Sequence, residues 1–308
     1  MILCCGEALI DMLPRETTGG EQAFAPYAGG SVFNTAIALG RLGAPAGFLS
    51  GLSTDLFGQI LETTLAESHV DTTLAIRSDR PTTLAFVKLT DGQADYAFYD
   101  ENTAGRMISA RDLPEIPAGV GAMFFGGISL PPDPCGGAYE TLMLREAGAR
   151  VTMIDPNIRP GFIRDEAAYR ARIGRMMAAA TIVKSSDEDL AWLGLTPGDL
   201  LAAGARLVCL TEGAKGVTAL WAGGNCTVAA KPVEVVDTVG AGDTFNAGFL
   251  AGLHRAGMLG AEALTAPSAA TLTPALELGV AAAAVTVSRA GANPPWATEL
   301  EGELEGWP

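Results

Sequence analysis

The sequence predicts a doubly wound α/β fold: a mostly parallel sheet flanked by helices, with a small antiparallel sheet set apart from it. Short apolar runs alternate along the chain with longer helical patterns. The runs are too uniformly apolar to have one wet face, which is typical of strands buried on both faces of a parallel sheet. With 308 residues, 48% of them hydrophobic, the chain can form this fold as one domain, residues 1–308.

Six apolar runs are predicted to be strands of the main sheet: Ile2–Cys5, Ala46–Ser50, Ala122–Phe125, Val151–Ile154, Thr181–Val183 and Leu207–Leu210. Six helical patterns lie between and after them: Asn34–Leu42, Leu56–Glu67, Ala138–Ala147, Glu166–Ala179, Asp243–Ala256 and Pro274–Val287. This alternation predicts helices on both faces of the sheet.

One region breaks the alternation. Two extended segments, Thr82–Thr90 and Asp95–Asn102, are joined through Asp91-Gly92, a strong signal for a β-hairpin. An antiparallel hairpin does not fit inside a parallel sheet, so we expect it to pair with the turn-rich segment Met12–Tyr27. Segments 12–28 and 82–102 would then form a lid over the carboxyl ends of the parallel strands, where open α/β sheets bind their ligands.

Charge and cysteine content exclude several classes of protein. The 20 Lys and Arg against 35 Asp and Glu give a formal net charge of −15, which repels nucleic-acid backbones and anionic membranes. Five cysteines without CxxC spacing and two histidines exclude a His-rich metal site and favour a reducing compartment. The apolar stretch at Leu278–Val287 is about half of a ~20-residue membrane span. We expect a cytoplasmic protein that binds neither membranes nor nucleic acids.

The most informative segment runs from Asp237 to Phe249 and reads DTVGAGDTFNAGF. The small residues Gly240, Ala241 and Gly242 precede a helical pattern whose first amides would point back at the turn and create an anion hole. Asp243 opens that helix, where it would orient and deprotonate a hydroxyl beside a bound phosphoryl group. In isolation such an aspartate is more often an N-cap only. A base beside an anion hole suggests phosphoryl transfer.

The whole segment closely resembles the second signature of the PfkB, or ribokinase-like, carbohydrate kinases, whose Gly-Ala-Gly-Asp supplies the anion hole and the catalytic aspartate. Residues 28–36 resemble the first signature, which implies that Gly29, Gly30 and Asn34 bind sugar hydroxyls. Asp11, just after the first strand, matches the aspartate with which the family binds the sugar. The resemblance extends over nearly the whole chain and implies a ribokinase-like fold and an ATP-dependent sugar kinase.

Two motifs in the second half resemble family motifs around sugar and metal. Asp155–Arg159 matches the Asp-x-Asn-x-Arg of fructokinases and 2-keto-3-deoxygluconate kinases, which implies that Arg159 lies near sugar and phosphate. Residues 184–188, beginning with Lys184, occupy the place of Asn-x-x-Glu, whose Glu helps to hold Mg²⁺ through water. This implies that Lys184 binds the cofactor and Glu188 the metal, although Ser185 stands where the family has Asn.

Further resemblances concern ATP and its counter-ions. Residues 211–216 are similar to the family's Thr-x-Gly-x-x-Gly turn beside the nucleotide phosphates, which implies that Thr211, Gly213 and Gly216 bind ATP. A polyanionic donor bound by an acidic protein requires Mg²⁺. The family often binds a monovalent cation such as K⁺ near its second signature, where Asp237 is the matching residue.

The lid carries the evidence on the substrate. Side chains alternate along a strand, so Tyr96, Phe98 and Asp100 share one face. This strand resembles the corresponding strand of the 2-keto-3-deoxygluconate kinases, which has Arg at the place of Asp100. In those kinases the Arg helps to hold the substrate carboxylate. An acid there repels an acidic sugar and accepts hydrogen bonds from a neutral one. We therefore expect Phe98 and Asp100 to face a neutral sugar, and the resemblance to fructokinases implies phosphorylation of fructose at its 6-hydroxyl.

Other interpretations of the sequence stay open. Within the family these are a 2-keto-3-deoxygluconate kinase and a ribokinase, and a nucleoside kinase would share the fold. A sugar-binding or nucleotide-sensing regulator without catalysis is the interpretation from a different class, against which the retained Asp243 argues. The lid would also allow a homodimer to form through it.

Overall fold

An eight-stranded sheet lies at the centre of the computed structural model, which describes residues 1–90, 93–260, 262, 264–300 and 302. Its strand order is β14-β13-β12-β11-β10-β9-β1-β4. The strands are β1 (Ile2–Cys5), β4 (Ala46–Leu49), β9 (Ala122–Gly126), β10 (Val151–Asp155), β11 (Ile182–Ser186), β12 (Leu207–Thr211), β13 (Val217–Trp221) and β14 (Gly224–Val228). All pairs from β4 to β12 are parallel, whereas β13 and β14 are antiparallel. The six predicted strands are confirmed, and the antiparallel hairpin at the edge was not predicted.

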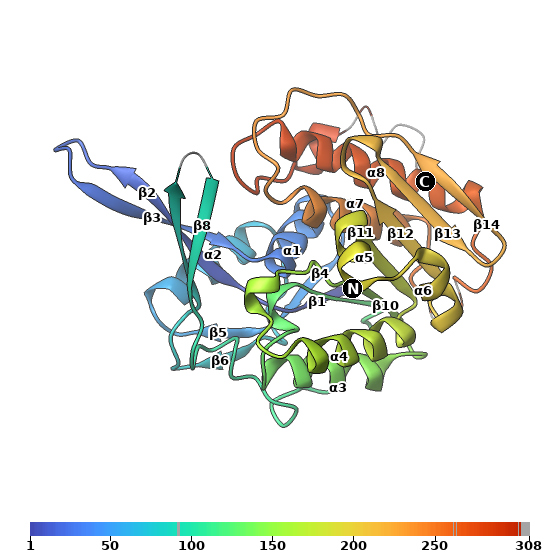
Figure 1. Ribbon diagram of the computed structural model, residues 1–308, viewed down its shortest axis with the longest axis horizontal. Coiled ribbons are helices and arrows are strands. Elements are labelled where there is room, and N and C mark those ends of the chain that lie inside the picture. Colours follow the sequence, from blue (N-terminus) through green and yellow to red (C-terminus); the bar gives the residue numbers. More distant parts are fainter. Residues whose placement is uncertain (91–92, 261, 263, 301, 303–308) are drawn as a thin grey trace.

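Helices cover both faces of this sheet, as predicted (Figure 1). One face packs against α1 (Ser31–Arg41), α2 (Leu56–Glu67), α7 (Ala241–Arg255) and α8 (Ala269–Val287). The other packs against α3 (Cys135–Glu146), α4 (Glu166–Ala179), α5 (Asp187–Leu193) and α6 (Pro197–Ala203). Because side chains alternate along a strand, Ile2 and Cys4 enter the first core while Leu3 and Cys5 enter the second. This explains why the strands are apolar without interruption.

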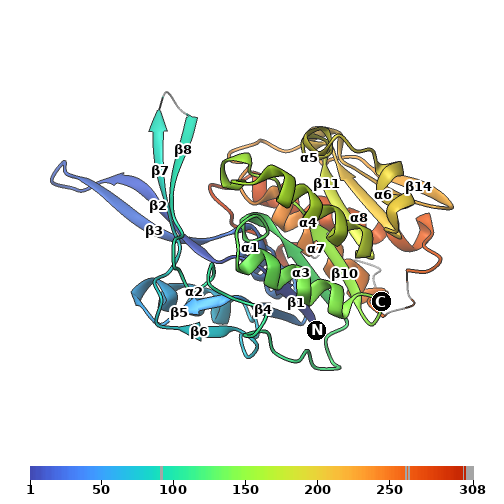
Figure 2. The same cartoon turned by 60° about the horizontal axis from the view of Figure 1, so that its bottom comes forward.

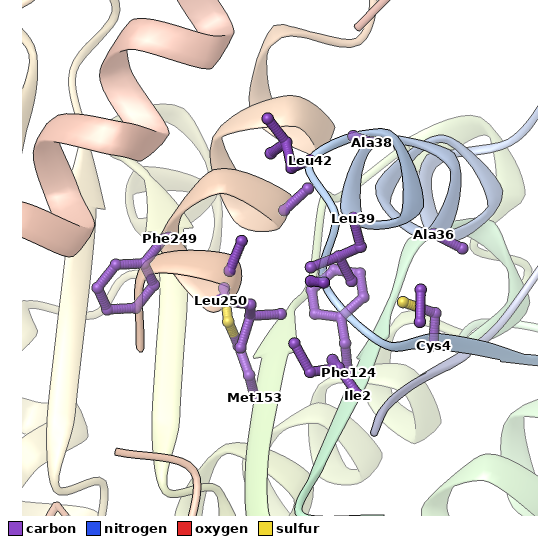
Figure 3. Close-up of a cluster of buried hydrophobic side chains, with 14 of the residues drawn as sticks. Ile2, Cys4, Ala36, Ala38, Leu39, Leu42, Phe124, Met153, Phe249 and Leu250 are labelled. Carbon is purple, nitrogen blue, oxygen red and sulfur yellow. The ribbon is translucent and has the colours of Figure 1, made fainter. Parts of the chain in front are cut away.

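Figure 3 shows the first of these two cores. Ile2, Phe124 and Met153 from the strands meet Leu39 of α1 and Leu250 of α7, and all five side chains are fully buried. Packing of α1 and α7 on the same strands brings their N-termini together at one end of the sheet, where the site described below lies.

The α8 helix begins earlier than predicted, at Ala269, where Ser268 and Thr271 form a capping box. By length and composition, it is the one helix among the described residues that could cross a membrane. Half of its apolar window is buried inside the fold, where it packs along α7. A core helix explains its composition.

The predicted small sheet is present as a separate four-stranded sheet of order β3-β2-β7-β8, for which we keep the name lid. Its strands are β2 (Leu9–Glu16), β3 (Gln22–Gly29), β7 (Leu84–Thr90) and β8 (Gln93–Tyr99). β7 and β8 form the predicted hairpin, although its turn, Asp91-Gly92, lies outside the described residues. The β7–β8 hairpin is joined to β2 by parallel pairing between Ile10–Met12 and Leu84–Phe86. Both hairpins project from the body of the molecule (Figures 1 and 2).

Short elements connect these parts. A two-stranded sheet of β5 (Gly51–Ser53) and β6 (Ile76–Ser78) lies beside α2. Four single 3₁₀ turns complete the described elements: η1 (Gly127–Ser129), η2 (Pro160–Phe162), η3 (Gly213–Lys215) and η4 (Ala297–Leu300).

Candidate active site

A cavity of about 1040 Å³ lies between the lid and the carboxyl ends of the parallel strands. Its sheet-side wall contains Glu7 after β1, Gly127 after β9 and Asp155 at the end of β10. Its lid wall contains Tyr96 and Phe98. This is the place that the fold class predicts for a ligand.

Asp243 lies in the wall of this cavity, in the first turn of α7. It is buried, and Asn34 of α1 donates a hydrogen bond from Nδ2 to Asp243 Oδ2 over 2.9 Å. The pKa of Asp243 is raised to about 7, mainly by burial and also by Asp155 and Glu7, whereas the Asn34 hydrogen bond and Lys184 oppose the rise. The site therefore contains a carboxyl group that can take up and release a proton near neutral pH.

The turn before Asp243 has the shape that the sequence predicts. Gly240 has a φ of 77°, in the left-handed region, and a Cβ there would stand 2.7 Å from the Ala292 side chain. Ala241 begins α7, and a Cβ on Gly242 would stand 3.4 Å from Lys184 Nζ. The first amides of a helix have no partner within it, so this glycine turn leaves donors available for an anion.

The predicted sugar-binding residues gather around the root of the lid. Asp11 of β2 lines the cavity, and Gly29 on the neighbouring strand β3 makes room for its side chain, because a Cβ at Gly29 would stand 2.4 Å from Asp11 Oδ2. Burial raises the pKa of Asp11 to about 6. Gly30, with a φ of 109°, lines the cavity at the N-terminus of α1. Asn34 lies one turn further along and reaches the site through its bond to Asp243.

Glu7 is a buried carboxylate that sequence analysis did not identify as a site residue. It accepts hydrogen bonds from the Ser31 amide at 3.0 Å and from the Ser129 amide at 3.3 Å. It thereby caps α1, whose own N-cap, Gly30, has no side chain to do so. Burial raises the pKa of Glu7, and the hydrogen bonds oppose this. The tight turn Gly6-Glu7 before the lid was its only signal in the sequence.

Three buried side chains meet beneath the cavity. Lys184 Nζ donates to Asp155 Oδ2 at 2.9 Å, and Asn246 Nδ2 donates to the same oxygen at 2.8 Å. Burial acts to lower the pKa of Lys184, but attraction to Asp155 outweighs it and the pKa is raised. Lys184 is therefore a charged ammonium group at the cavity end of the sheet.

The lid presents the predicted face to the cavity, since Tyr96, Phe98 and Asp100 all line it. Phe98 packs edge-on against Phe162, with ring centroids 4.3 Å apart. Asp100 is not a free acid: Arg106, a second lining residue, forms an ion pair with it at 2.5 Å. The Arg106 guanidinium balances the charge of Asp100, so this pair repels an acidic sugar less than the free acid expected from the sequence.

A second cavity of about 390 Å³ adjoins the first and shares Arg159 and Lys184 with it. Glu188, in the first turn of α5, lines it and is exposed. Its neighbour Asp189 also lines it but is buried, and accepts a hydrogen bond from the Ile158 amide at 3.0 Å. Asp189 is a second carboxylate that sequence analysis missed.

The residues predicted to bind the nucleotide lie where β12 ends and turns into β13. Thr211 ends β12, and Gly213 and Gly216 form the turn to β13. In the part of the chain that the structure describes, these three lie outside the walls of both cavities. Asp237 accepts hydrogen bonds from the amides of Val239 and Gly291, which joins the loop before α7 to the end of α8.

Comparisons with known proteins show the family to which this chain belongs. Residues 1–299 match the model of the pfkB family carbohydrate kinases. The chain is 57% identical over 265 residues to a fructokinase of Rhizobium leguminosarum bv. trifolii, covering 84% of this chain and 81% of that protein. The structure of a Xylella fastidiosa fructokinase with bound ATP has a TM-score of 0.89 at 27% identity, covering 99% and 98% of the two chains.

An aminoimidazole riboside kinase from Salmonella enterica, solved with aminoimidazole riboside and an ATP analogue, has a TM-score of 0.83 at 26% identity over 99% of each chain. One fold therefore serves kinases of different small molecules. The family match covers nearly the whole chain, and residues of both segments 28–36 and 237–249 line the cavity around Asp243. The chain belongs to the pfkB family of carbohydrate kinases.

Proposed function

We propose that this chain transfers the γ-phosphoryl group of ATP to the primary 6-hydroxyl of fructose. The observation that carries the reaction is the start of α7, where a buried carboxyl group with a pKa of about 7 lies beside a glycine turn. The sugar follows from the 57% identity to a fructokinase.

In this proposal Asp243 is the general base. Its carboxylate takes the proton of the sugar hydroxyl while that oxygen attacks the γ-phosphorus; the bond to the bridging oxygen breaks, and ADP leaves with its electron pair. A pKa of about 7 suits this role, because about half of the groups are then ionised at neutral pH. The Ala241 amide donates to the Thr238 carbonyl, so the amides of Gly242 and Asp243 would stabilise the charge on the transferred group.

The sugar would bind along the root of the lid. The Asp11 carboxylate accepts hydrogen bonds from its hydroxyls, and Gly29 and Gly30 let the backbone approach closely. Phe98 packs against its carbon skeleton. The paired Asp100 and Arg159 also line this cavity.

The nucleotide would lie across the carboxyl ends of β11 and β12 and the start of β13. Thr211, Gly213 and Gly216 bind its phosphates from one end, and Lys184 contacts the γ-phosphate beside Gly242. The lid closes over the bound sugar, because water admitted to the site would be phosphorylated in its place.

Mg²⁺ would accompany the nucleotide. The described residues contain no group of three or more His, Cys, Asp or Glu side chains that could hold a metal alone. Magnesium usually keeps several waters and binds through one or two carboxylates and the substrate phosphates. Glu188 and Asp189, hard oxygen donors beside Lys184, fit that mode through water. The bound ion would neutralise charge on the phosphates.

Two further expectations belong to this proposal. A K⁺ ion near Asp237 would stabilise the loop before α7, where both carboxylate oxygens already fix the backbone. The exposed Phe24, Tyr27 and Tyr99 of the lid offer apolar contacts for a homodimer. All five cysteines are free thiols.

The proposal is tested by measuring ADP release with ATP, Mg²⁺ and a panel of fructose, ribose, 2-keto-3-deoxygluconate, tagatose and adenosine. We expect the highest kcat/KM with fructose, and a product whose phosphorus couples to the C6 protons in NMR. A higher kcat/KM with another member of the panel would refute the choice of sugar. Adenosine as the best substrate would place this chain with the nucleoside kinases.

A further inference from the structure

We infer that Asp155 and Asn246 are positioning residues, which together hold the Lys184 ammonium group against the turn where phosphoryl transfer takes place. The inference rests on the proposed kinase function. All three side chains are buried, with exposed fractions of 1% for Asp155, 0% for Asn246 and 5% for Lys184. Burying charged and polar groups lowers the stability of the fold unless they are paired, and a paired buried cluster seldom adds much to it. This points to a functional role for the cluster.

The three residues converge from separate elements. Asp155 ends β10, Lys184 lies in β11, and Asn246 lies on α7, three residues after Asp243. One helix therefore carries both the proposed base and the donor that fixes the counter-ion of the lysine. Residues at this spacing share a helix face, which explains how both can point at the sheet.

Lys184 is aimed at the reaction by this arrangement. Its ammonium lies 3.4 Å from where a Cβ on Gly242 would stand, and the residue lines both cavities. An ammonium group has three donors. Asp155 receives one of them, and phosphoryl oxygens in the cavity can receive the others.

Asn246 completes the pairing from the other side. Asp155 Oδ2 accepts both the ammonium and the Asn246 amide, at 2.9 and 2.8 Å, so the carboxylate is held by two donors rather than one. The remaining oxygens, Asp155 Oδ1 and Asn246 Oδ1, are buried without a protein partner among the described residues. The carboxylate is thus oriented entirely by Lys184 and Asn246, and loss of Asn246 would let it turn and carry the ammonium away.

The charges around Lys184 support this role. Asp155, Asp189 and Asp243 face it from β10, α5 and α7 and favour its protonated form. Among these carboxylates, Asp155 alone has a hydrogen bond to the ammonium in the described structure. The position of the Lys184 ammonium group therefore depends on Asp155, whereas all three carboxylates favour its protonated form.

The inference is tested by a double-mutant cycle in kcat, with the sugar that the wild type phosphorylates best. We expect Asn246→Ala to lower kcat roughly tenfold and to change the KM of the sugar less than about twofold, because the Asn246 amide donates to Asp155 and the residue lies outside the walls of both described cavities. In a Lys184→Met background the same substitution should have no further effect on kcat. Asn225→Ala, on the exposed face of β14, is the matched control and should leave kcat unchanged.

Asp155→Asn provides a second variant for the same comparison, should Asn246→Ala fail to fold. An equal fractional loss of kcat in both backgrounds would show a general structural role and overturn the inference. An unchanged kcat of Asn246→Ala in the otherwise wild-type protein would overturn it as well. A wild type that phosphorylates another sugar than fructose refutes only the choice of sugar. A wild type that phosphorylates none removes the proposed function and this inference together.

Discussion

Replacing Asn34 by alanine tests how the proposed base is tuned. Asn34 donates to Asp243 Oδ2 at 2.9 Å, and the bond favours the ionised carboxylate. A hydrogen bond to a charged group is worth roughly 1.5–3 kcal/mol. Since one pKa unit corresponds to about 1.4 kcal/mol, its loss should raise the pKa of Asp243 from about 7 by roughly one to two units.

The direction of the effect follows from the role of the base, which works only when ionised. As pH falls below the pKa of Asp243, kcat/KM declines about tenfold per pH unit. In the Asn34→Ala variant this acidic limb of the pH profile should therefore lie at higher pH. At pH 7 the wild type is about half ionised and the variant about 1–10%, which predicts a loss of roughly 5- to 50-fold. At pH 9 the difference from this cause should shrink to about twofold or less.

The assay is kcat/KM for fructose between pH 5.5 and 9.5, which reports the ionisation of the free enzyme. Asn225→Ala, an exposed substitution on β14, is the control and should follow the wild type. A loss of equal size at every pH would show that Asn34 acts on sugar binding alone. A wild-type limb centred far below pH 7 would refute the assignment of a buried base.

Three further predictions concern the turn, the substrate and the lid. Gly242→Val would press methyl groups against Lys184, so turnover should fall at least roughly 10²-fold at a nearly unchanged Tm; normal turnover would refute the anion hole. Asp100→Asn removes the ion pair of the Arg106 guanidinium, so the ratio of kcat/KM for fructose to that for 2-keto-3-deoxygluconate should fall about tenfold. An unchanged ratio would show that this pair does not affect the choice of substrate. Hydrogen exchange across the described residues of 82–102 should slow when sugar is added, whereas equal exchange would indicate a static lid.

Much of the fold follows from periodicity. The uniform burial of β1, β9 and β10 reflects their place between two helical layers, and the apolar runs show it directly. The lid was recognised because its hairpin contradicts a parallel sheet. The β13–β14 hairpin was missed because its strands lie at the sheet edge, where β14 is exposed or half-buried and its sequence lacks an apolar run.

The site was predicted unevenly. Asp243 and its glycine turn form one continuous motif, whereas the bond from Asn34 joins residues 209 positions apart. Such a contact depends on how α1 and α7 pack and has no local signal. The same holds for Asn246 on Asp155, 91 positions apart. The pairing of Asp100 with Arg106 depends on the path of an irregular loop, which propensity does not specify.

The general base role of Asp243 is the central claim, and kcat of Asp243→Asn at saturating ATP and fructose tests it most directly. Asparagine keeps the size of the side chain and an oxygen for the Asn34 amide, so folding and ATP binding should persist. We predict a fall in kcat of roughly 10²–10⁴-fold, with the Kd of ATP from calorimetry within about twofold of the wild type. A variant with near-normal kcat would show that Asp243 only stabilises the start of α7, and would contradict the proposed mechanism.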